Sequence, residues 1–104
     1  QWDSHSTDKY LHIVIRNSLA YFGFYNDDLR GNTVISPNTW YHIAFVYDSV
    51  SNKKFIYVNG VLDASGASLS PYKGSSGNTT IGGALKENKF FNGTIDEVKI
   101  YDRP

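Results

Sequence analysis

The chain contains no cysteine and no methionine, and neither sign of charge is in excess, with ten Lys and Arg residues against ten Asp and Glu residues. The missing cysteine excludes a disulfide framework, a thiolate zinc site and a thiol nucleophile, and it leaves the redox compartment open. The zero net charge argues against nucleic-acid binding and against a polybasic membrane patch. No run approaches the roughly 18 consecutive apolar residues of a transmembrane helix, so membrane insertion is not expected.

What the sequence does have is a hydrophobic residue at nearly every second position. The length of 104 residues predicts one small domain, 1–104. β-branched and aromatic side chains supply the alternation, and no window keeps the i, i+3, i+4, i+7 spacing of a helix. An all-β fold is therefore predicted. Strands are expected over 10–16, 19–25, 40–48, 53–59, 79–81 and 93–101, with at most a short one at 33–35.

Turn chemistry refines this pattern. The pair Asn59-Gly60 between two hydrophobic runs predicts a two-residue type I′ hairpin, because both residues tolerate positive φ. The run 19–25 is apolar on both faces, as in a strand covered on both sides, and Gly23 within it indicates a close backbone approach or a bulge. Residues 26–38 and 65–78 are polar or rich in Ser and Gly, and both are predicted to be loops.

Four motifs follow one another in the chain: NTWYHIAFVYD, IYVNGVLD, NTTIGG and FNGTIDEVKIYDRP. Over residues 38–103 this succession resembles the laminin G-like, concanavalin A-like jelly-roll domains, and the runs DKYLHIVIRN and LAYFGFYNDD resemble the strands that precede these motifs. The resemblance implies an antiparallel two-sheet jelly-roll sandwich that acts as a binding module of extracellular or cell-surface proteins. The family has further strands before the point that matches Gln1. A truncated domain lacking the usual N-terminal strands is therefore expected.

Members of the wider superfamily that cleave glycans need two carboxylates facing each other on one sheet. This chain has only two glutamates, Glu87 and Glu97, and neither stands in a Glu-x-Asp-x-x-Glu context. Asp96 and Glu97 are adjacent where the alternation slips by one residue, which predicts a β-bulge. Asp96 is expected to accept hydrogen bonds from backbone amides there, and Glu97 to be solvated. Because a Gly-x-Ser-x-Gly elbow is also missing, no enzymatic activity is predicted.

The histidines give no indication of a metal centre. His5, His12 and His42 have no spacing that requires them to converge. His5 lies in the polar leader, and His12 occupies the alternate phase of its strand. His42, next to Trp40 in the strongest strand, is expected to be a packing residue.

The segment 26–31 was compared with a calcium-binding loop. It does not match an EF-hand, because Arg30 occupies the fifth ligand position and Pro37 stands in the place of the bidentate glutamate. Calcium also accepts irregular oxygen cages, so a looser site with Asp27 or Asp28 and backbone carbonyls stays open. A solvated turn with a contact between Asp28 and Arg30 is the favoured interpretation.

A carbohydrate site would need an exposed aromatic ring beside hydroxyl-binding side chains. The ligand-binding residues predicted on this basis are Tyr25, Asn26, Asp27 and Asp28 at one rim and Tyr72 in the Ser/Gly-rich loop. Most of the eight Tyr, six Phe and two Trp residues are expected in the core, because other large apolar residues are few.

The predicted function is a non-catalytic extracellular or cell-surface recognition module that binds carbohydrate or a surface protein. Two glycosylation triplets, at Asn78 and Asn92, are consistent with that location. The alternative is a structural unit that self-assembles, because a sandwich with an open edge recruits another chain and forms a strand-sharing homo-oligomer. A glycan-cleaving enzyme is the remote alternative.

Overall fold

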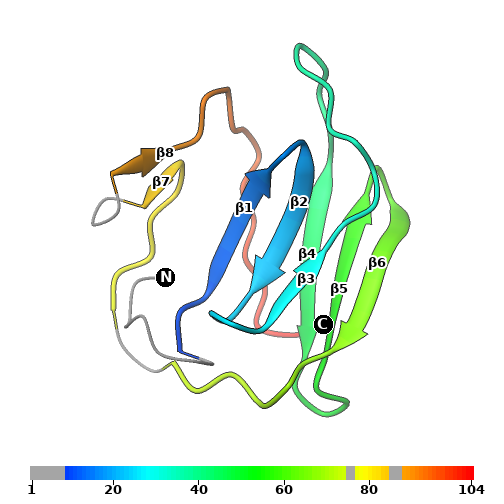
Figure 1. Cartoon of the computed structure of the whole chain (residues 1–104), viewed down its shortest axis with the longest axis vertical. Coiled ribbons are helices and arrows are strands. Elements are labelled where there is room, and N and C mark those ends of the chain that lie inside the picture. The colour runs from blue at the N-terminus through cyan, green and yellow to red at the C-terminus, as the bar shows by residue number, and fades with distance from the viewer. Residues whose placement is uncertain (1–8, 75–76, 85–87) are drawn as a thin grey trace.

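The computed structural model describes residues 9–74, 77–84 and 88–104. Two three-stranded antiparallel sheets, with strand orders β1-β2-β3 and β4-β5-β6, face each other, and a two-stranded ribbon β7-β8 stands beside them (Figure 1). This confirms the predicted all-β, two-sheet antiparallel fold. The strands are β1 His12–Arg16, β2 Leu19–Gly23, β3 Asp28–Arg30, β4 Ile43–Asp48, β5 Lys53–Val58, β6 Val61–Ala67, β7 Gly83–Ala84 and β8 Lys89–Phe90.

Three hairpins close on two-residue turns in which both residues have positive φ. They are Asn17–Ser18 (51° and 62°), Tyr25–Asn26 (64° and 57°) and Asn59–Gly60 (50° and 80°). Positive φ at both positions is the signature of a type I′ turn, whose twist matches that of the flanking strands. The predicted Asn59-Gly60 hairpin is therefore confirmed. The Tyr25–Asn26 turn is less expected, because a bulky aromatic residue rarely adopts this conformation.

The core lies where β2 packs across β5. Ala20 and Phe22 of β2, with Phe24 just beyond it, are buried against Ile56 and Val58 of β5. Aromatic contacts extend this core, since the ring of Phe22 meets Phe24 edge-on at 5.7 Å between centroids. Half-buried side chains from both sheets surround it, among them Leu29, Ile43, Phe45, Tyr47 and Ala64.

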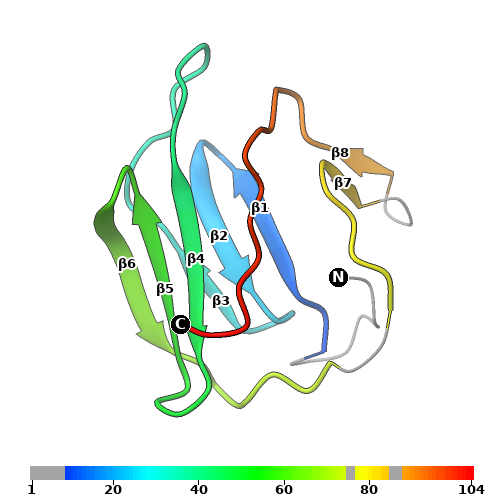
Figure 2. The same ribbon diagram turned by 180° about the vertical axis from the view of Figure 1, so that it is seen from behind.

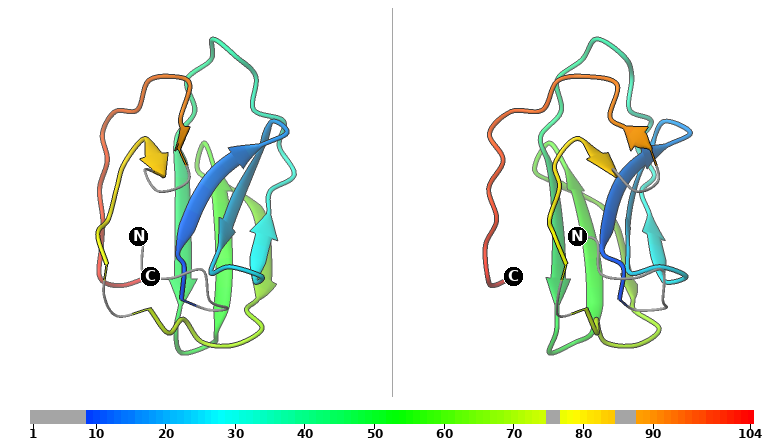
Figure 3. Two further views of the ribbon diagram at one scale, coloured as in Figure 1. Left: turned by 60° about the vertical axis from the view of Figure 1, so that its left-hand side comes forward. Right: turned by 90° about the vertical axis from the view of Figure 1, so that its left-hand side faces the viewer.

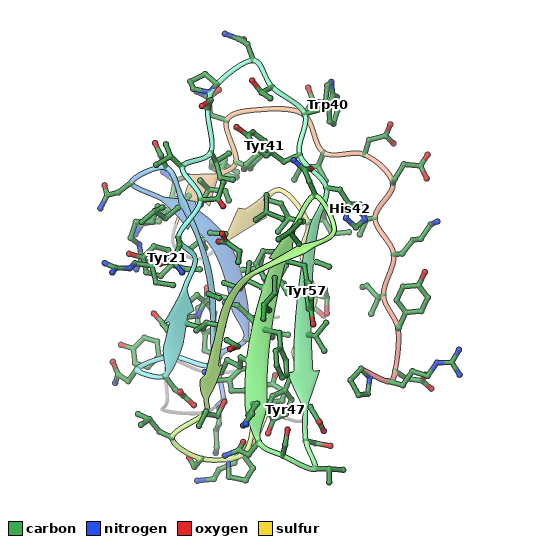
Figure 4. All side chains as sticks on the ribbon, turned by 90° about the vertical axis from the view of Figure 1, so that its right-hand side faces the viewer. Tyr21, Trp40, Tyr41, His42, Tyr47 and Tyr57 are labelled. Carbon is green, nitrogen blue, oxygen red and sulfur yellow. The ribbon has the colours of Figure 1, made fainter. Side chains whose placement is uncertain are left out.

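The sequence predicts that β2 is covered on both faces, but its outer face is not covered by a second sheet. Tyr21 projects from that face, away from the β4-β5-β6 sheet (Figure 4). The guanidinium of Arg16 lies 5.0 Å from the centroid of the Tyr21 ring. Neighbouring side chains therefore half-cover this face, and the second sheet covers only the opposite one.

The predicted strand 93–101 is not formed. The chain runs extended beside β4, as the view from behind shows (Figure 2), but residues 91–104 enter no strand pairing. The amide of Phe91 bonds to the carbonyl of Gly82 at 2.8 Å, just before this segment begins. Glu97 has a φ of 53°, so the slip in alternation at Asp96-Glu97 marks an irregular backbone rather than a bulge in a ladder. The physical reason is that no partner strand lies beside this segment among the described residues.

Three smaller boundaries also differ. The strand expected at 79–81 is not formed, and β7 begins only at Gly83. Residues 33–35, where at most a short strand was expected, are irregular, and Ile35 N bonds to Ser18 O at 2.7 Å. The predicted loop 26–38 contains β3, because residues after the Tyr25–Asn26 turn pair back onto β2. The predicted loop 65–78 begins only after β6 ends at Ala67.

Candidate functional site

Two of the five predicted ligand-binding residues are used by the fold itself. Asp27 is 5% exposed, and its Oδ1 lies 2.8 Å from the ammonium of Lys54, which is also buried. The second carboxylate oxygen of Asp27 accepts the Leu69 amide at 3.2 Å, and the Lys54 ammonium lies 4.7 Å from the Phe24 ring. The structure therefore places Asp27 in an interior ion pair between the sheets, with both carboxylate oxygens occupied.

Tyr72 also packs inward. Its ring lies 4.8 Å from that of Phe24, and its amide donates to the hydroxyl of Tyr47 at 3.3 Å. The two loops that carry the predicted residues do contact each other, because the backbone amide of Leu69 in one donates to the carboxylate of Asp27 in the other. They meet through side chains that stabilise the core, and Tyr72 is half-buried there.

The remaining predicted residues lie on the outer face of the β1-β2-β3 sheet. Gly23 pairs with His12 of β1 on one side and with Asp28 of β3 on the other. The Asp28 carboxylate and the His12 ring occupy the space that a side chain at Gly23 would fill, with His12 Nε2 3.1 Å from Asp28 Oδ1. The close backbone approach or bulge predicted at Gly23 is therefore not seen, because side chains fill the space above it and the register is regular. The predicted partner of Asp28 was Arg30, and the structure places His12 there instead.

Tyr25 and Asn26 stand at the tip of the adjoining turn. The ring of Tyr25 meets that of Tyr10 edge-on at 6.2 Å, and Tyr10 stacks on His12 at 5.5 Å with a tilt of 30°. Asn26 is exposed, whereas Tyr25 is half-buried. We call Tyr10, His12, Tyr25, Asn26 and Asp28 the outer corner. Of these, the sequence did not indicate Tyr10 or His12.

A second feature was not indicated by any single residue. A groove of about 3170 Å³ runs along β1, β4, the β7–β8 ribbon and the extended segment 91–104, and the residues of the outer corner also line it. We call it the open groove. Large apolar side chains that line it are exposed, including Ile13 (52%), Trp40 (69%), Ile95 (45%), Val98 (50%) and Ile100 (79%). Trp40 and His42 lie at the end of β4 where the chain enters this strand (Figure 4).

Two further aspartates, Asp63 and Asp48, stabilise loops. Asp63 of β6 accepts the amides of Asn32 at 2.7 Å and Thr33 at 3.0 Å, as well as the Thr33 hydroxyl. Burial raises the pKa of Asp63, but these hydrogen bonds outweigh it and hold the pKa below its ordinary value. Asp48 accepts the amide of Val50 at 2.9 Å, and side-chain and backbone hydrogen bonds from Ser51 and Val50 lower its pKa.

Near the C-terminus, Asp96 accepts the amide of Glu97 at 2.8 Å, as expected of it, and both side chains are exposed. Glu87 and His5 lie outside the described residues.

The expectation for His42 is wrong, because its side chain is exposed. Its backbone instead ties the Asn59 hairpin, donating to the Asn59 side chain at 2.9 Å and accepting the Asn59 amide at 2.7 Å. Within residues 9–74, 77–84 and 88–104, no three His, Asp or Glu side chains gather as a metal site requires.

Comparison with known proteins gives one match. The family model described as the concanavalin A-like lectin/glucanases superfamily matches residues 3–104. No curated protein and no solved structure matches the chain. The family match agrees with the resemblance of the four motifs and indicates a module that binds carbohydrate or protein.

Proposed function

This chain belongs to the concanavalin A-like lectin/glucanase superfamily, and on that premise we propose that it is a non-catalytic, extracellular recognition module whose ligand is a polypeptide. The open groove carries this proposal. Contiguous exposed apolar surface on a small protein marks an interaction site, because leaving it in water is costly. Exposed apolar side chains such as Ile13, Trp40 and Ile100 line it, and a polypeptide suits a patch of this kind.

Three of the aspartates are held by other side chains or by backbone amides, which favours a non-catalytic role for them, whereas Asp96, Glu97 and Asp102 are exposed along the open groove. Glycoside hydrolysis requires one carboxylate as acid and another as nucleophile or base, both free to reach the sugar. Asp27 is paired with Lys54, Asp28 lies against His12, and Asp63 is engaged by loop amides. These three side chains therefore have structural partners that compete with substrate.

An extracellular or cell-surface location accords with the family and with two surface features. The glycosylation triplets at Asn78 and Asn92 both present exposed asparagines, where a glycan would meet no steric barrier. The described part of the chain also has no helix long and apolar enough to span a bilayer.

Selection with a phage-displayed library of random twelve-residue peptides tests this function. Wild-type protein should enrich peptides that an Ile100→Glu variant does not retain, because the added charge lies in the groove. Val61→Glu is the matched control, since Val61 is also exposed (68%) but lies on β6 outside the groove. If wild type enriches nothing over Ile100→Glu, or if Val61→Glu has the same effect, the groove is not the ligand site.

The outer corner favours carbohydrate as a second candidate ligand. Tyr25 and Asn26 hold positive φ, and strained residues are maintained where they serve a purpose. A glycan array, read with and without calcium, should then show binding that Tyr25→Ala combined with Asp28→Ala weakens. Tyr101→Ala, which removes an exposed tyrosine elsewhere, should leave it unchanged. If no glycan on the array binds in either buffer, carbohydrate is excluded as the ligand of the outer corner.

A further inference from the structure

The dipeptide Asn-Gly occurs twice in the chain, and the structure holds the two copies differently. One is Asn59-Gly60 in the turn between β5 and β6, and the other is Asn92-Gly93 after β8. Because glycine has no side chain to shield its backbone nitrogen, this nitrogen can reach the side-chain amide of a preceding asparagine. The two copies therefore place the same reactive pair in two different environments.

The reaction open to such a pair is spontaneous deamidation, which needs no cofactor. The backbone nitrogen of glycine attacks Cγ of asparagine, and a new N–Cγ bond replaces the bond to the side-chain nitrogen. The proton lost by the glycine nitrogen passes through solvent to the leaving group, which departs as ammonia and leaves a five-membered succinimide. Water then opens this ring at either carbonyl and gives aspartate or isoaspartate. The ring closes only where the side chain and the glycine nitrogen can be brought together.

The hairpin holds Asn59 away from this geometry. The Asn59 side-chain oxygen accepts the His42 amide at 2.9 Å, and the Asn59 amide donates to the His42 carbonyl at 2.7 Å. The two turn residues have φ of 50° and 80°, and the strand residues on either side of them, Val58 and Val61, are paired. In a type I′ turn the nitrogen of the second central residue points away from the side chain of the first. Ring closure at Asn59 therefore requires the turn to open and the side chain to leave His42.

Asn92 is under neither restraint. Asn92 and Gly93 are exposed, and they lie in the segment 91–104, which pairs with no strand in the described part of the chain. Figure 3 shows this segment leaving the β7-β8 ribbon and running along the outside of the molecule. The preceding amide, that of Phe91, bonds to Gly82 O at 2.8 Å. Beyond it, neither the Asn92 side chain nor the Gly93 amide makes a hydrogen bond to any residue that the structure describes.

From this contrast we propose that Asn92 is a modification site, at which asparagine converts spontaneously to aspartate and isoaspartate, whereas the hairpin protects Asn59. The product replaces a neutral amide by a carboxylate on a residue that lines the open groove, so the formal net charge falls from zero to minus one. It also removes the glycosylation triplet, because a glycan is attached to the asparagine side-chain nitrogen. A glycan and an acid at Asn92 therefore exclude each other.

Peptide mapping by mass spectrometry tests the contrast and does not depend on the proposed function. The whole chain is incubated in mildly alkaline buffer, and the acid form at each Asn-Gly pair is followed with time. Asn92 should convert about tenfold or more faster than Asn59, because reaction at Asn59 first disrupts its hydrogen bonds to His42. Equal rates, a faster reaction at Asn59, or no acid at either pair would overturn the proposal.

The same measurement in concentrated urea separates the effect of the fold from that of the sequence. Unfolding releases Asn59 from His42 and from its turn, so the two Asn-Gly pairs should then convert at similar rates. If Asn92 stays ahead of Asn59 by the same factor in urea, the neighbouring sequence causes the difference, and protection by the hairpin is wrong.

Two substitutions test the assignment at Asn92. Asn92→Gln should remove the early acidic form on ion-exchange chromatography, whereas Asn78→Gln should leave it, because Asn78 is exposed but is followed by threonine. Gly93→Ala keeps the asparagine and should slow the conversion, since a methyl group stands beside the attacking nitrogen. The nearest neighbours of that methyl group are atoms of the Phe91 ring, which is 46% exposed and can turn aside. An acidic form that persists in Asn92→Gln, or an unchanged rate in Gly93→Ala, would show that the reaction takes place elsewhere.

Discussion

The two sides of this small sandwich are built in opposite ways. Where β2 crosses β5, apolar side chains from both sheets are buried, and the Asp27–Lys54 pair joins the sheets through the interior. Where β1 and β4 form the sheet edges, Ile13 and Ile100 are exposed. The comparison teaches that burial here follows strand position and not side-chain type, because isoleucine is fully buried at Ile56 of the central strand β5 but 52% exposed at Ile13 of the edge strand β1.

The same difference separates the residues that determine the stability of the fold from the residues that would determine ligand binding. Residues at the β2–β5 crossing have lost their contact with water, so truncating them leaves a cavity or an unpaired charge. Residues of the open groove still contact water, so changing them alters little in the free protein. They would matter once a ligand covers them. Four substitutions test this division, beginning with the largest expected effect.

Phe24→Ala should lower the free energy of unfolding by about 3–5 kcal/mol, because a fully buried ring is replaced by a cavity. The loss also removes ring contacts with Tyr47 at 4.9 Å and Tyr72 at 4.8 Å. Urea denaturation followed by circular dichroism measures it. A loss below about 1 kcal/mol would mean that the core does not centre on this residue.

Asp27→Asn should cost about 3 kcal/mol, because it leaves the Lys54 ammonium buried without a counter-charge. Asp28→Asn is the control, since its partner His12 lies on the outer face and the Asp28 side chain is 30% exposed. The same denaturation experiment compares the two variants. Equal losses in the two variants would show that the buried Asp27–Lys54 pair does not stabilise the β2–β5 crossing more than the outer His12–Asp28 pair stabilises its sheet.

Asp63→Asn should cost about 1 kcal/mol at neutral pH by weakening the bonds to Asn32 and Thr33. Its effect should also depend on pH. Because the folded-state pKa lies below the ordinary 3.8, the ionised carboxylate stabilises the protein above that value. This contribution is lost as the pH falls through the lowered folded-state pKa.

The difference in stability between wild type and Asp63→Asn should therefore shrink on acidification below about pH 4. Denaturation curves recorded between neutral and strongly acidic pH measure it. A difference that stays constant over this range would show that the Asp63 pKa is not lowered.

Ile100→Thr should change stability by less than about 0.5 kcal/mol, since the side chain is already exposed in the free protein. The same variant should weaken binding of a selected groove peptide. A clear loss of stability without ligand would show that the groove is closed in solution. The β2–β5 crossing and the open groove would then not differ in how strongly their residues stabilise the free protein.

Much of the fold was predictable because it depends on local signals. The run of β-branched residues from Ile13 to Ile15 between His12 and Arg16 identified β1, and Asn59-Gly60 identified the hairpin between β5 and β6 through its tolerance of positive φ. The order of four motifs was sufficient to indicate the superfamily. Truncation of the domain and formation of an oligomer remain predictions.

The site was harder to predict because function depends on which side chains meet. Tyr25, Asn26 and Asp28 lie together in the outer corner, as their adjacency indicated. Asp27 lies between them in sequence and yet points inward. The reason is that in the turn the Asp27 carboxylate meets a buried lysine from β5, a residue 27 positions away. No periodicity within 24–28 carries that information.

The sequence by itself determined the strand-forming segments, the turn types and the family, because these follow from side-chain alternation, backbone φ preferences and motif order. The tertiary structure alone decided which apolar residues are core. The hydrophobic runs of 19–25 and 93–101 both predict a strand, but the first packs on β5 and the second pairs with no strand in the part of the chain that the structure describes. A strand is stabilised by hydrogen bonds to another strand, so the pairing, and with it the open groove, depends on what lies beside each segment.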